Sequence, residues 1–430
     1  MLIITLFLNN YSPSPIDSNS NIKQPCIYKT GESNSPSTSK KAYKLSCAVS
    51  KGGSKIPMAA IFKDGEKGYA IVTHKDTMKV IDDYKNKLSK NITLAGNNLR
   101  ASLKRLFKVI DADGVAKLTR IDFIEAILAS KVMSAGAAGS TFGPRESWSR
   151  PDVQILGDLN VVMPVKIFDN GQWSKPLVHD KEFDGYLLFT PGALLEDSNN
   201  DYDEVVIKGK FDIEAYCKLY ERRILPLLHF ANDEAAAKGK KAIVTVPGLG
   251  CGIFAGKFDK DIHGKFNEAL KWILKKHSSN LKSIDLVYYG RVDKDVNSND
   301  ELIKYDNGLK YKMCFSESAE FRNQLDKPIN FKFDSDEDYS NRILFSIVAW
   351  SHICLPGNTF FGGNRWTDDA VKAAATSTMS SLFPGVEAEY ESSSHKYLPK
   401  SYSKWSDVPS VSTFHLSTKG GLLVLEEVKE

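Results

Sequence analysis

The sequence predicts an α/β fold preceded by a small, mainly helical region. Ala242–Val246 is an apolar, β-branched run of strand length, of the kind that is buried on both faces of an α/β sheet. From about residue 156, similar runs alternate with helical patterns, which indicates repeated strand–helix units. Between Ile56 and about Val132, the apolar residues instead follow helical spacing.

Composition narrows the class of protein. A length of 430 residues favours two domains. The net charge of +4 is small and the lysines are scattered among acids, so nucleic-acid binding is not expected. Six widely spaced cysteines without a Cys-x-x-Cys motif predict neither a zinc site nor a disulfide framework, and they favour a reducing compartment. Leu2–Leu8 is apolar but too short to span a bilayer, and no membrane partner is expected.

The N-terminal part divides into a tail, a helical domain and a linker. Residues 1–55 are rich in Ser, Asn, Pro and Lys and are expected to be disordered. Residues 56–135 form the helical domain, with helices expected over Thr77–Leu88 and Leu99–Ile110. Residues 136–155 follow as the linker, because the residues around the domain boundary are small and rich in Gly and show no apolar periodicity.

A segment of the helical domain resembles an EF-hand, the helix–loop–helix unit that binds calcium. Asp111 and Asp113 match loop positions one and three, and Asp122 matches position twelve. Val115 at position five offers no side-chain oxygen, and Ala116 stands where the turn requires Gly. Because calcium needs about six to eight oxygen ligands, this helix–loop–helix is expected to pack without binding metal.

Residues 156–430 form the expected α/β domain. Strands are expected at Leu159–Phe168, Gly185–Thr190, Ala242–Val246, Ser283–Gly290, Ile329–Phe333 and Ile343–Trp350. Helices are expected at Ile213–Lys238, Ile262–His277 and Thr367–Leu382, with Pro226 kinking or splitting the first of them. Residues 385–430 are irregular and end in an acidic tail, which suits a secretion signal or an ordinary frayed terminus.

Four glycines follow the strand Ala242–Val246, at positions 248, 250, 252 and 256, and a helix begins soon after. Glycine lets a ligand approach bare backbone, and consecutive N–H groups in such a loop form an anion-binding nest. The loop lacks the Gly-Lys-Ser/Thr ending of a Walker loop, and its alternating glycines do not fit a dinucleotide fingerprint. A phosphate or diphosphate is the expected ligand, and a tight turn without a ligand is the alternative.

The run Pro-Gly-Leu-Gly-Cys-Gly-Ile-Phe-Ala-Gly at residues 247–256 resembles the diphosphate loop of macrodomains, the ADP-ribose-binding fold. The resemblance implies a mixed sheet sandwiched by helices, with ADP-ribose as the ligand and no further cofactor or metal. It also implies that the backbone of the loop holds the diphosphate and that Phe254 packs beside the distal ribose. The implied diphosphate-binding residues are Gly248, Gly250, Cys251, Gly252, Ile253 and Phe254.

A second segment resembles the ribose-binding part of macrodomains. After the last predicted strand come an Asn, a Gly-Gly pair and an acidic turn that opens an Ala-rich helix. The resemblance implies that Asn358, Gly362 and Gly363 lie against ribose. It also implies that Asp368 and Asp369 match the adjacent acids of poly(ADP-ribose) glycohydrolases.

The order of the segments indicates a permuted chain. Ile329–Asp336 resembles the macrodomain strand whose end supplies an Asp to the adenine amino group, a role implied for Asp334 or Asp336. In ordinary macrodomains the Asn/Gly-Gly segment precedes the diphosphate loop, whereas here it follows, so we expect a circularly permuted macrodomain. The resemblance covers roughly Leu156–Pro384 and is strongest to the MavL-type macrodomain effectors of Legionella. That family implies removal of ADP-ribose from modified ubiquitin and secretion into the host-cell cytoplasm.

The two adjacent acids suit cleavage of a glycosidic bond, which passes through an oxocarbenium-like state. One carboxylate stabilises that charge or activates water, and a neighbour whose pKa is raised by like charge holds a hydroxyl group or donates a proton. If Asp368 and Asp369 have these roles, Ala at either position keeps the affinity for ADP-ribose within a few fold and abolishes turnover. Thr367-Asp-Asp is equally an ordinary helix N-cap sequence.

Three functions therefore remain open from the sequence. The first is a hydrolase that removes ADP-ribose from a protein, which the resemblance implies is ubiquitin, and the adjacent acids favour it. The second is a module that binds ADP-ribose without cleaving it. The third is an interaction scaffold with an empty cleft, for which free ADP-ribose would give no heat of binding.

Overall fold

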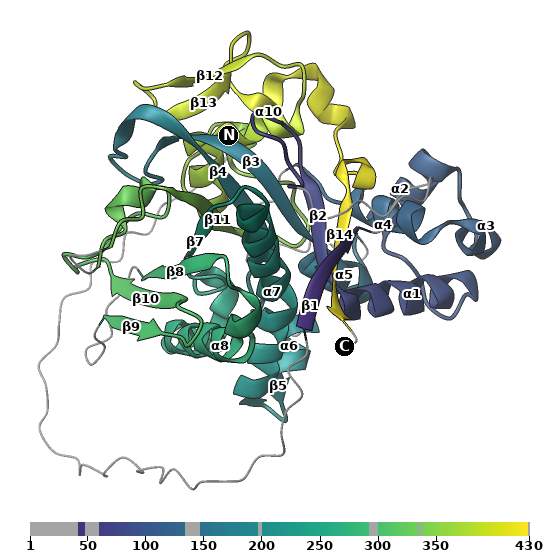
Figure 1. Ribbon diagram of the computed structural model, residues 1–430. Helices are drawn as coiled ribbons and strands as arrows, with labels where there is room; N and C mark the ends of the chain where they lie inside the picture. Colours follow the sequence, from purple (N-terminus) through teal and green to yellow (C-terminus); the bar gives the residue numbers. More distant parts are fainter. Residues whose placement is uncertain are drawn as a thin grey trace, which may run out of the picture. The chain divides into compact units, whose positions relative to one another are not determined.

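A ten-stranded mixed sheet organises the residues that the computed structural model describes, which are 42–47, 60–133, 147–196, 200–291, 300–333 and 337–428 (Figure 1). In spatial order its strands are β1 (Ala42–Cys47), β14 (Leu422–Val428), β2 (Ala70–His74), β3 (Asn160–Asp169), β4 (Val178–Pro191), β11 (Arg342–Trp350), β7 (Lys241–Val246), β8 (Ile284–Arg291), β10 (Lys310–Phe315) and β9 (Glu301–Lys304). Outside this sheet, β5 (Val206–Ile207) pairs with β6 (Lys210–Phe211), and β12 (Ala388–Glu391) pairs with β13 (Lys396–Pro399).

The centre of the sheet is parallel. β4, β11, β7, β8 and β10 run in one direction, and Leu344 of β11 lies between Gly185 of β4 and Ile243 of β7. β3 and β9 close this parallel block with antiparallel pairings. Because the carboxyl ends of parallel strands meet at one edge, the loops that follow β4, β11 and β7 share that edge.

Helices cover both faces of the sheet. They are α1 (Lys75–Ser89), α2 (Asn97–Phe107), α3 (Ala112–Lys117), α4 (Arg120–Leu128), α5 (Arg150–Asp158), α6 (Asn200–Val205), α7 (Ile213–Ala237), α8 (Ile262–His277), α9 (Asp368–Ala375) and α10 (Thr378–Leu382). Short 3₁₀ turns are η2 (Ile253–Phe258), η3 (Ser278–Asn280), η4 (Pro328–Asn330), η5 (Phe360–Gly362), η6 (Trp405–Asp407), η7 (Pro409–Thr413) and η8 (Thr418–Gly420).

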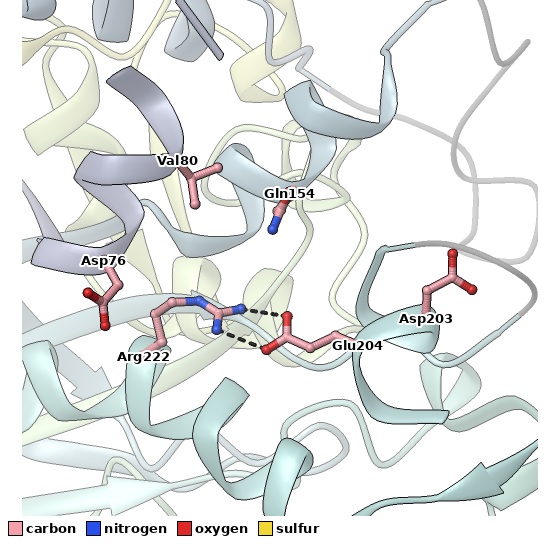
Figure 2. A pocket seen from close by; sticks show the side chains of 6 residues that line it. All are labelled: Asp76, Val80, Gln154, Asp203, Glu204 and Arg222. Atoms are coloured by element: carbon pink, nitrogen blue, oxygen red, sulfur yellow. Dashed lines mark hydrogen bonds and ion pairs between the residues drawn. The ribbon is translucent and has the colours of Figure 1, made fainter. Parts of the chain in front are cut away.

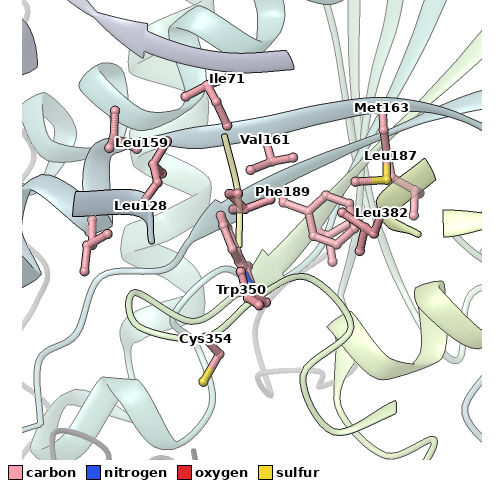
Figure 3. Close-up of a cluster of buried hydrophobic side chains, with 14 of the residues drawn as sticks. Ile71, Leu128, Leu159, Val161, Met163, Leu187, Phe189, Trp350, Cys354 and Leu382 are labelled. Atoms are coloured by element: carbon pink, nitrogen blue, oxygen red, sulfur yellow. The ribbon is translucent and has the colours of Figure 1, made fainter. Parts of the chain in front are cut away.

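Two hydrophobic cores follow from the alternation of side chains along the strands. Val244 and Phe345 belong to the core that includes the buried sides of α7 and α8. Their neighbours Ile243 and Leu344 belong to the other core, with α9, α10 and the N-terminal helices. Figure 3 shows part of this second core, where side chains of β3 and β4 gather near Trp350.

The N-terminal helices are joined to the sheet, although the sequence suggests a separate domain. β2 is a strand of the sheet and leads directly into α1. Beyond α4, the backbone N–H of Val132 donates to Ile353 O at 2.9 Å, and Leu355 N–H donates to Val132 O at 2.8 Å. Lys41–Glu430 accordingly forms one compact unit, which the expected linker at 136–155 does not divide.

The EF-hand-like segment adopts two short capped helices. Asp111, expected at the first position of a calcium loop, is the N-cap of α3 and accepts from Gly114 N–H at 2.8 Å. Asp122, expected at the twelfth position, forms a capping box with Thr119 at the start of α4. The carboxylates thus satisfy helix N–H groups, a role that short polar side chains fill at helix starts.

Several other expected elements differ in the structure. Ile329–Phe333 is not a strand, and η4 covers part of it, so the strand preceding β11 is β10. The expected helix Thr367–Leu382 is divided into α9 and α10, because Thr376 is extended and bridges to Ile167 of β3. α7 runs unbroken through Pro226.

The two ends of the described chain are also more ordered than the sequence predicts. Ala42–Cys47, within the expected disordered tail, is β1, and Leu422–Val428, within the expected irregular terminus, is β14. The two strands pair with each other, purple beside yellow in Figure 1. The rest of the expected tail lies outside the described residues, and the description resumes at Ala60.

Candidate functional site

The glycine loop after β7 lies against the loop after β4. A Cβ atom added to Gly192 would meet Gly250 N at 2.1 Å, and one added to Gly250, whose φ is +67°, would meet Ala193 O at 2.7 Å. Leu195 N–H donates to Phe254 O at 2.7 Å. Glycine is therefore required at 192 and 250 by backbone contact and, at 250, by a left-handed conformation.

Tyr220 of α7 forms hydrogen bonds with both loops. Its buried hydroxyl donates to Leu249 O at 2.6 Å and accepts from Ala193 N–H at 3.0 Å. One side chain thereby satisfies a backbone group from each loop, which fixes their relative position.

The other predicted diphosphate residues differ in what they face. Gly248 lies under the His263 ring, which a Cβ atom would approach to 2.9 Å, and the Cys251 side chain is buried. At Gly252 a Cβ atom would meet nothing within 4 Å, and Ile253 is exposed. The open backbone at Gly252 and Ile253 is therefore the part of the loop that a ligand can approach.

The loop after β11 reaches the glycine loop through a buried charge network. The His352 ring lies 6.1 Å from the Phe254 ring, and its Nε2 lies 3.2 Å from Asp201. Arg223 of α7 donates to Asp201 at 2.7 and 2.9 Å and to Asp158 at 2.9 Å. The loops after β7 and β11 therefore lie at the same edge of the sheet.

The charges of this network set its protonation. Burial by itself would raise the pKa of Asp201, but Arg223 and His352 beside it hold that pKa well below its usual range. Burial lowers the pKa of His352, opposed by Asp201. His352 is enclosed and serves as a structural histidine that links the loops.

Asp369 is buried and organises the predicted ribose-binding turn. Only 2% of the residue is exposed, and its two carboxylate oxygens accept from Gly357 N–H at 2.8 Å and Asn358 N–H at 2.7 Å. Burial raises the pKa of Asp369 to about 7. The two backbone hydrogen bonds act to lower this pKa, and the charge of Asp368 raises it by a smaller amount. Burial, more than the like charge invoked from the sequence, is thus the main cause of the raised pKa.

Asp368 faces a different environment. Its Oδ2 accepts from Ala349 N–H at the end of β11 at 2.7 Å and lies 3.2 Å from Lys372 Nζ. More than a quarter of the Asp368 side chain is exposed, whereas Lys372 is buried. The N-cap of α9 is Thr367, whose Oγ1 accepts from Ala370 N–H, so neither aspartate is the capping residue.

The other residues that are predicted to bind ribose lie in the same loop, between β11 and α9. Asn358 is half-buried, with its side chain accepting from Thr359 N–H. Gly363 has a φ of +89° and open space at its Cβ position, and Lys396 Nζ donates to its carbonyl oxygen at 2.6 Å. Asp334 and Asp336, the predicted adenine ligands, lie outside the described residues.

Comparison with known proteins identifies the family. A family model described as "Macrodomain effector MavL" matches residues 69–403. The chain belongs to this macrodomain effector family. The match begins just before β2 and includes α1–α4, in agreement with their place in the same unit as the sheet. No curated protein sequence matches the chain.

Membership of a macrodomain effector family indicates ADP-ribose binding or hydrolysis as the class of activity. In this macrodomain effector the two motifs follow the adjacent parallel strands β7 and β11. Among the described residues, no helix combines the length and apolar character needed to cross a membrane.

One side-chain group in this macrodomain effector has the composition of a metal site. Potential ligand atoms of Asp300, Cys314 and Glu320 lie within 4.8 Å of one another. Asp300 already accepts from Phe315 N–H at 3.1 Å, and Glu320 pairs with Lys312. Burial raises the pKa of Cys314 to about 12, which disfavours the thiolate that a metal requires.

A cavity of about 400 Å³ lies beside the charge network, lined by Asp76, Val80, Gln154, Asp203, Glu204 and Arg222 (Figure 2). Arg222 donates to both oxygens of Glu204 at 2.9 Å and also pairs with Asp158. Ion pairs therefore run from this cavity through Asp158 and Arg223 to Asp201.

Sequence reasoning missed the residues beneath the loops. Arg223 and Tyr220 lie on α7, and Lys372 lies on α9, each remote in sequence from the backbone it supports. Little in the sequence marks Arg223, because it ends the charged run Glu221–Arg223 and only the residues after it are apolar. The partner itself could not be identified without the fold.

Proposed function

We propose that this chain removes ADP-ribose from an ADP-ribosylated protein, with ubiquitin as the candidate protein. The observation that carries the proposal is that the glycine loop and the loop that leads to Asn358–Asp369 follow the neighbouring parallel strands β7 and β11, with the rings of Phe254 and His352 6.1 Å apart. Family membership supports ADP-ribose as the ligand. The exposed position of Gly252 and Ile253 suits an anionic diphosphate, because backbone N–H groups of a glycine loop attract such groups.

In this proposal Asp368 is the catalytic carboxylate. Its contacts with Ala349 and Lys372 both involve Oδ2, which leaves Oδ1 for the substrate or a water molecule. In the reaction, a water oxygen bonds to the anomeric carbon of the ribose and the bond to the protein side chain breaks. The proton released from the water passes to the leaving side chain. A carboxylate beside the ribose stabilises the oxocarbenium-like transition state and orients the water.

Asp369 has a positioning role in the same proposal. Its burial and its two backbone hydrogen bonds support a function in holding Asn358 rather than in contacting ribose. We therefore expect Asp369→Ala to weaken ADP-ribose binding, which differs from the expectation drawn from the sequence.

Asp368→Asn tests the assignment. We expect it to lower the rate of ADP-ribose release from ADP-ribosylated ubiquitin by at least about a hundredfold. The dissociation constant for free ADP-ribose, measured by calorimetry, should stay within about threefold of the wild-type value. Asp113→Asn, a change at an exposed carboxylate on α3, is the matched control and should alter neither quantity.

The outcomes separate the candidate functions. Tight ADP-ribose binding without release from any modified protein would support a binding module. No heat at millimolar ADP-ribose would support a scaffold and reject both other functions. Wild-type turnover by Asp368→Asn would reject the catalytic role of Asp368 while leaving hydrolysis intact.

A further inference from the structure

Three large apolar side chains stand in solvent near the segment that leads into α9. Trp173 and Leu177 lie in the connection between β3 and β4, and they are 66% and 65% exposed. Trp366, two residues before Asp368, is 65% exposed. Tryptophan is usually largely buried, so two such residues on one part of the surface indicate a contact with another molecule. These three residues are called the tryptophan surface below.

Arg365 joins the two segments that carry this surface. Its guanidinium donates to the carboxylate of Asp169 at 2.8 and 3.0 Å and to Gln172 O at 3.1 Å. Trp173 directly follows Gln172, and Trp366 directly follows Arg365. The buried Asp169 carboxylate also accepts from Tyr390 at 2.7 Å, which fixes the anchor. The two chain segments that carry the tryptophans are thus joined by a well-connected ion pair.

We propose that the tryptophan surface binds the protein that carries ADP-ribose, through an apolar patch beside its modified side chain. This inference rests on the proposed function. The bond to be cleaved joins the ribose at Asp368 to that protein, so the protein must lie against the surface next to Asp368. Trp366 is its neighbour in the chain, and Arg365 joins this segment to the one that carries Trp173 and Leu177. Tryptophan is enriched among residues that dominate protein–protein binding.

The test compares a modified protein with the free ligand. Binding of the full chain to ADP-ribosylated ubiquitin and to free ADP-ribose is measured for the wild type, Trp173→Ala, Trp366→Ala and the double variant, each in the Asp368→Asn background to prevent turnover. The chain with both tryptophans intact should bind the modified protein at least tenfold more tightly than it binds free ADP-ribose. Each single change should remove about tenfold of that affinity, while affinity for free ADP-ribose stays within twofold.

Ile110→Ala provides the matched control, because Ile110 is 79% exposed and lies between α2 and α3. It should leave both affinities unchanged. The proposal is overturned if the modified protein binds no more tightly than free ADP-ribose, or if the tryptophan variants bind it as well as the wild-type surface does.

Two other outcomes assign the surface elsewhere. Equal losses for free ADP-ribose and for the modified protein would place Trp366 in the ligand cleft and reject a protein-docking role. Loss of self-association measured by light scattering, without a change in binding the modified protein, would show that a second copy of the chain covers the surface. A wild-type chain that does not bind free ADP-ribose would refute the proposed function itself, which is a different result from either of these.

Discussion

The buried carboxyl group of Asp369 holds a backbone turn and has a raised pKa. Its two oxygens accept from Gly357 and Asn358, so the turn that presents Asn358 depends on it. Removing the side chain would leave two N–H groups without these partners, at a cost of about 2–4 kcal/mol. The adjacent Asp368 has a similar place in the sequence but an exposed face and a lysine partner.

The raised pKa of Asp369 predicts a pH-dependent stability. Burial moves this pKa from 3.8 to about 7, so the folded chain holds the proton more tightly than the unfolded chain does. The stabilising contribution of protonation is complete below about pH 4 and is lost as the pH rises through about 7. We expect the wild-type advantage in unfolding free energy over Asp369→Asn to shrink between these values, by on the order of 1 kcal/mol per pH unit.

Denaturant unfolding of the wild type and Asp369→Asn, repeated from pH 4 to pH 8, measures this difference. Asp113→Asn, at an exposed position, serves as the comparison. A difference between wild type and Asp369→Asn that stays constant over the whole range would contradict the assignment.

At the scale of elements, the glycine loop after β7 and the loop after β4 form one interlocked unit. Gly192 and Gly250 touch through their backbones, and Tyr220 bonds to both loops. Gly252 lies in the same loop but faces open space. The glycines of one motif therefore serve different purposes, two for packing and one for access.

Alanine substitutions distinguish these purposes. We expect Gly192→Ala and Gly250→Ala to lower the melting temperature markedly, because the new Cβ atoms would lie 2.1 and 2.7 Å from backbone atoms. Gly252→Ala should leave the melting temperature nearly unchanged yet weaken ADP-ribose binding about tenfold, because its methyl group would stand where the ligand approaches. Thermal unfolding and calorimetry give the two readings. Unchanged affinity in Gly252→Ala would place the diphosphate elsewhere.

At the scale of the whole described unit, the sheet binds distant parts of the chain together. β1 and β14 pair, β14 and β2 pair, and the segment after α4 bonds to the loop after β11. The N-terminal helices therefore contribute to the same cooperative structure as the candidate site. Lys131 strengthens this link, because its buried Nζ donates to His352 O and lies 3.9 Å from the centre of the Trp350 ring.

This connectivity predicts a single unfolding transition. Scanning calorimetry of the full chain should show the helices and the sheet melting together, and a fragment beginning at residue 147 should fail to fold because it lacks β1 and β2. Leu425→Asp, a change in the buried part of β14, should lower the transition temperature for the entire unit. Separate transitions, or a folded fragment, would favour the two-domain organisation expected from the sequence.

Local sequence was sufficient for much of the centre of the fold. The apolar runs predict β7 and β11 within a residue or two, and periodicity predicts α1, α7 and α8. Strand segments such as β14 were missed because an edge or joining strand gains its stability from partners far along the chain. The expected strand Ile329–Phe333 was wrong for the related reason that a short apolar run forms no strand without a neighbour to pair with.

The sequence by itself determined the family resemblance, the glycine loop and the acidic pair, because these are defined by residue type and spacing over a few positions. Only the tertiary structure decided that the two loops share one edge and that Asp369 is buried while Asp368 is partly exposed. It also decided that Arg223 pairs with Asp158 and Asp201. Burial, strand pairing and charge compensation depend on contacts between residues distant in sequence, and no local pattern specifies them.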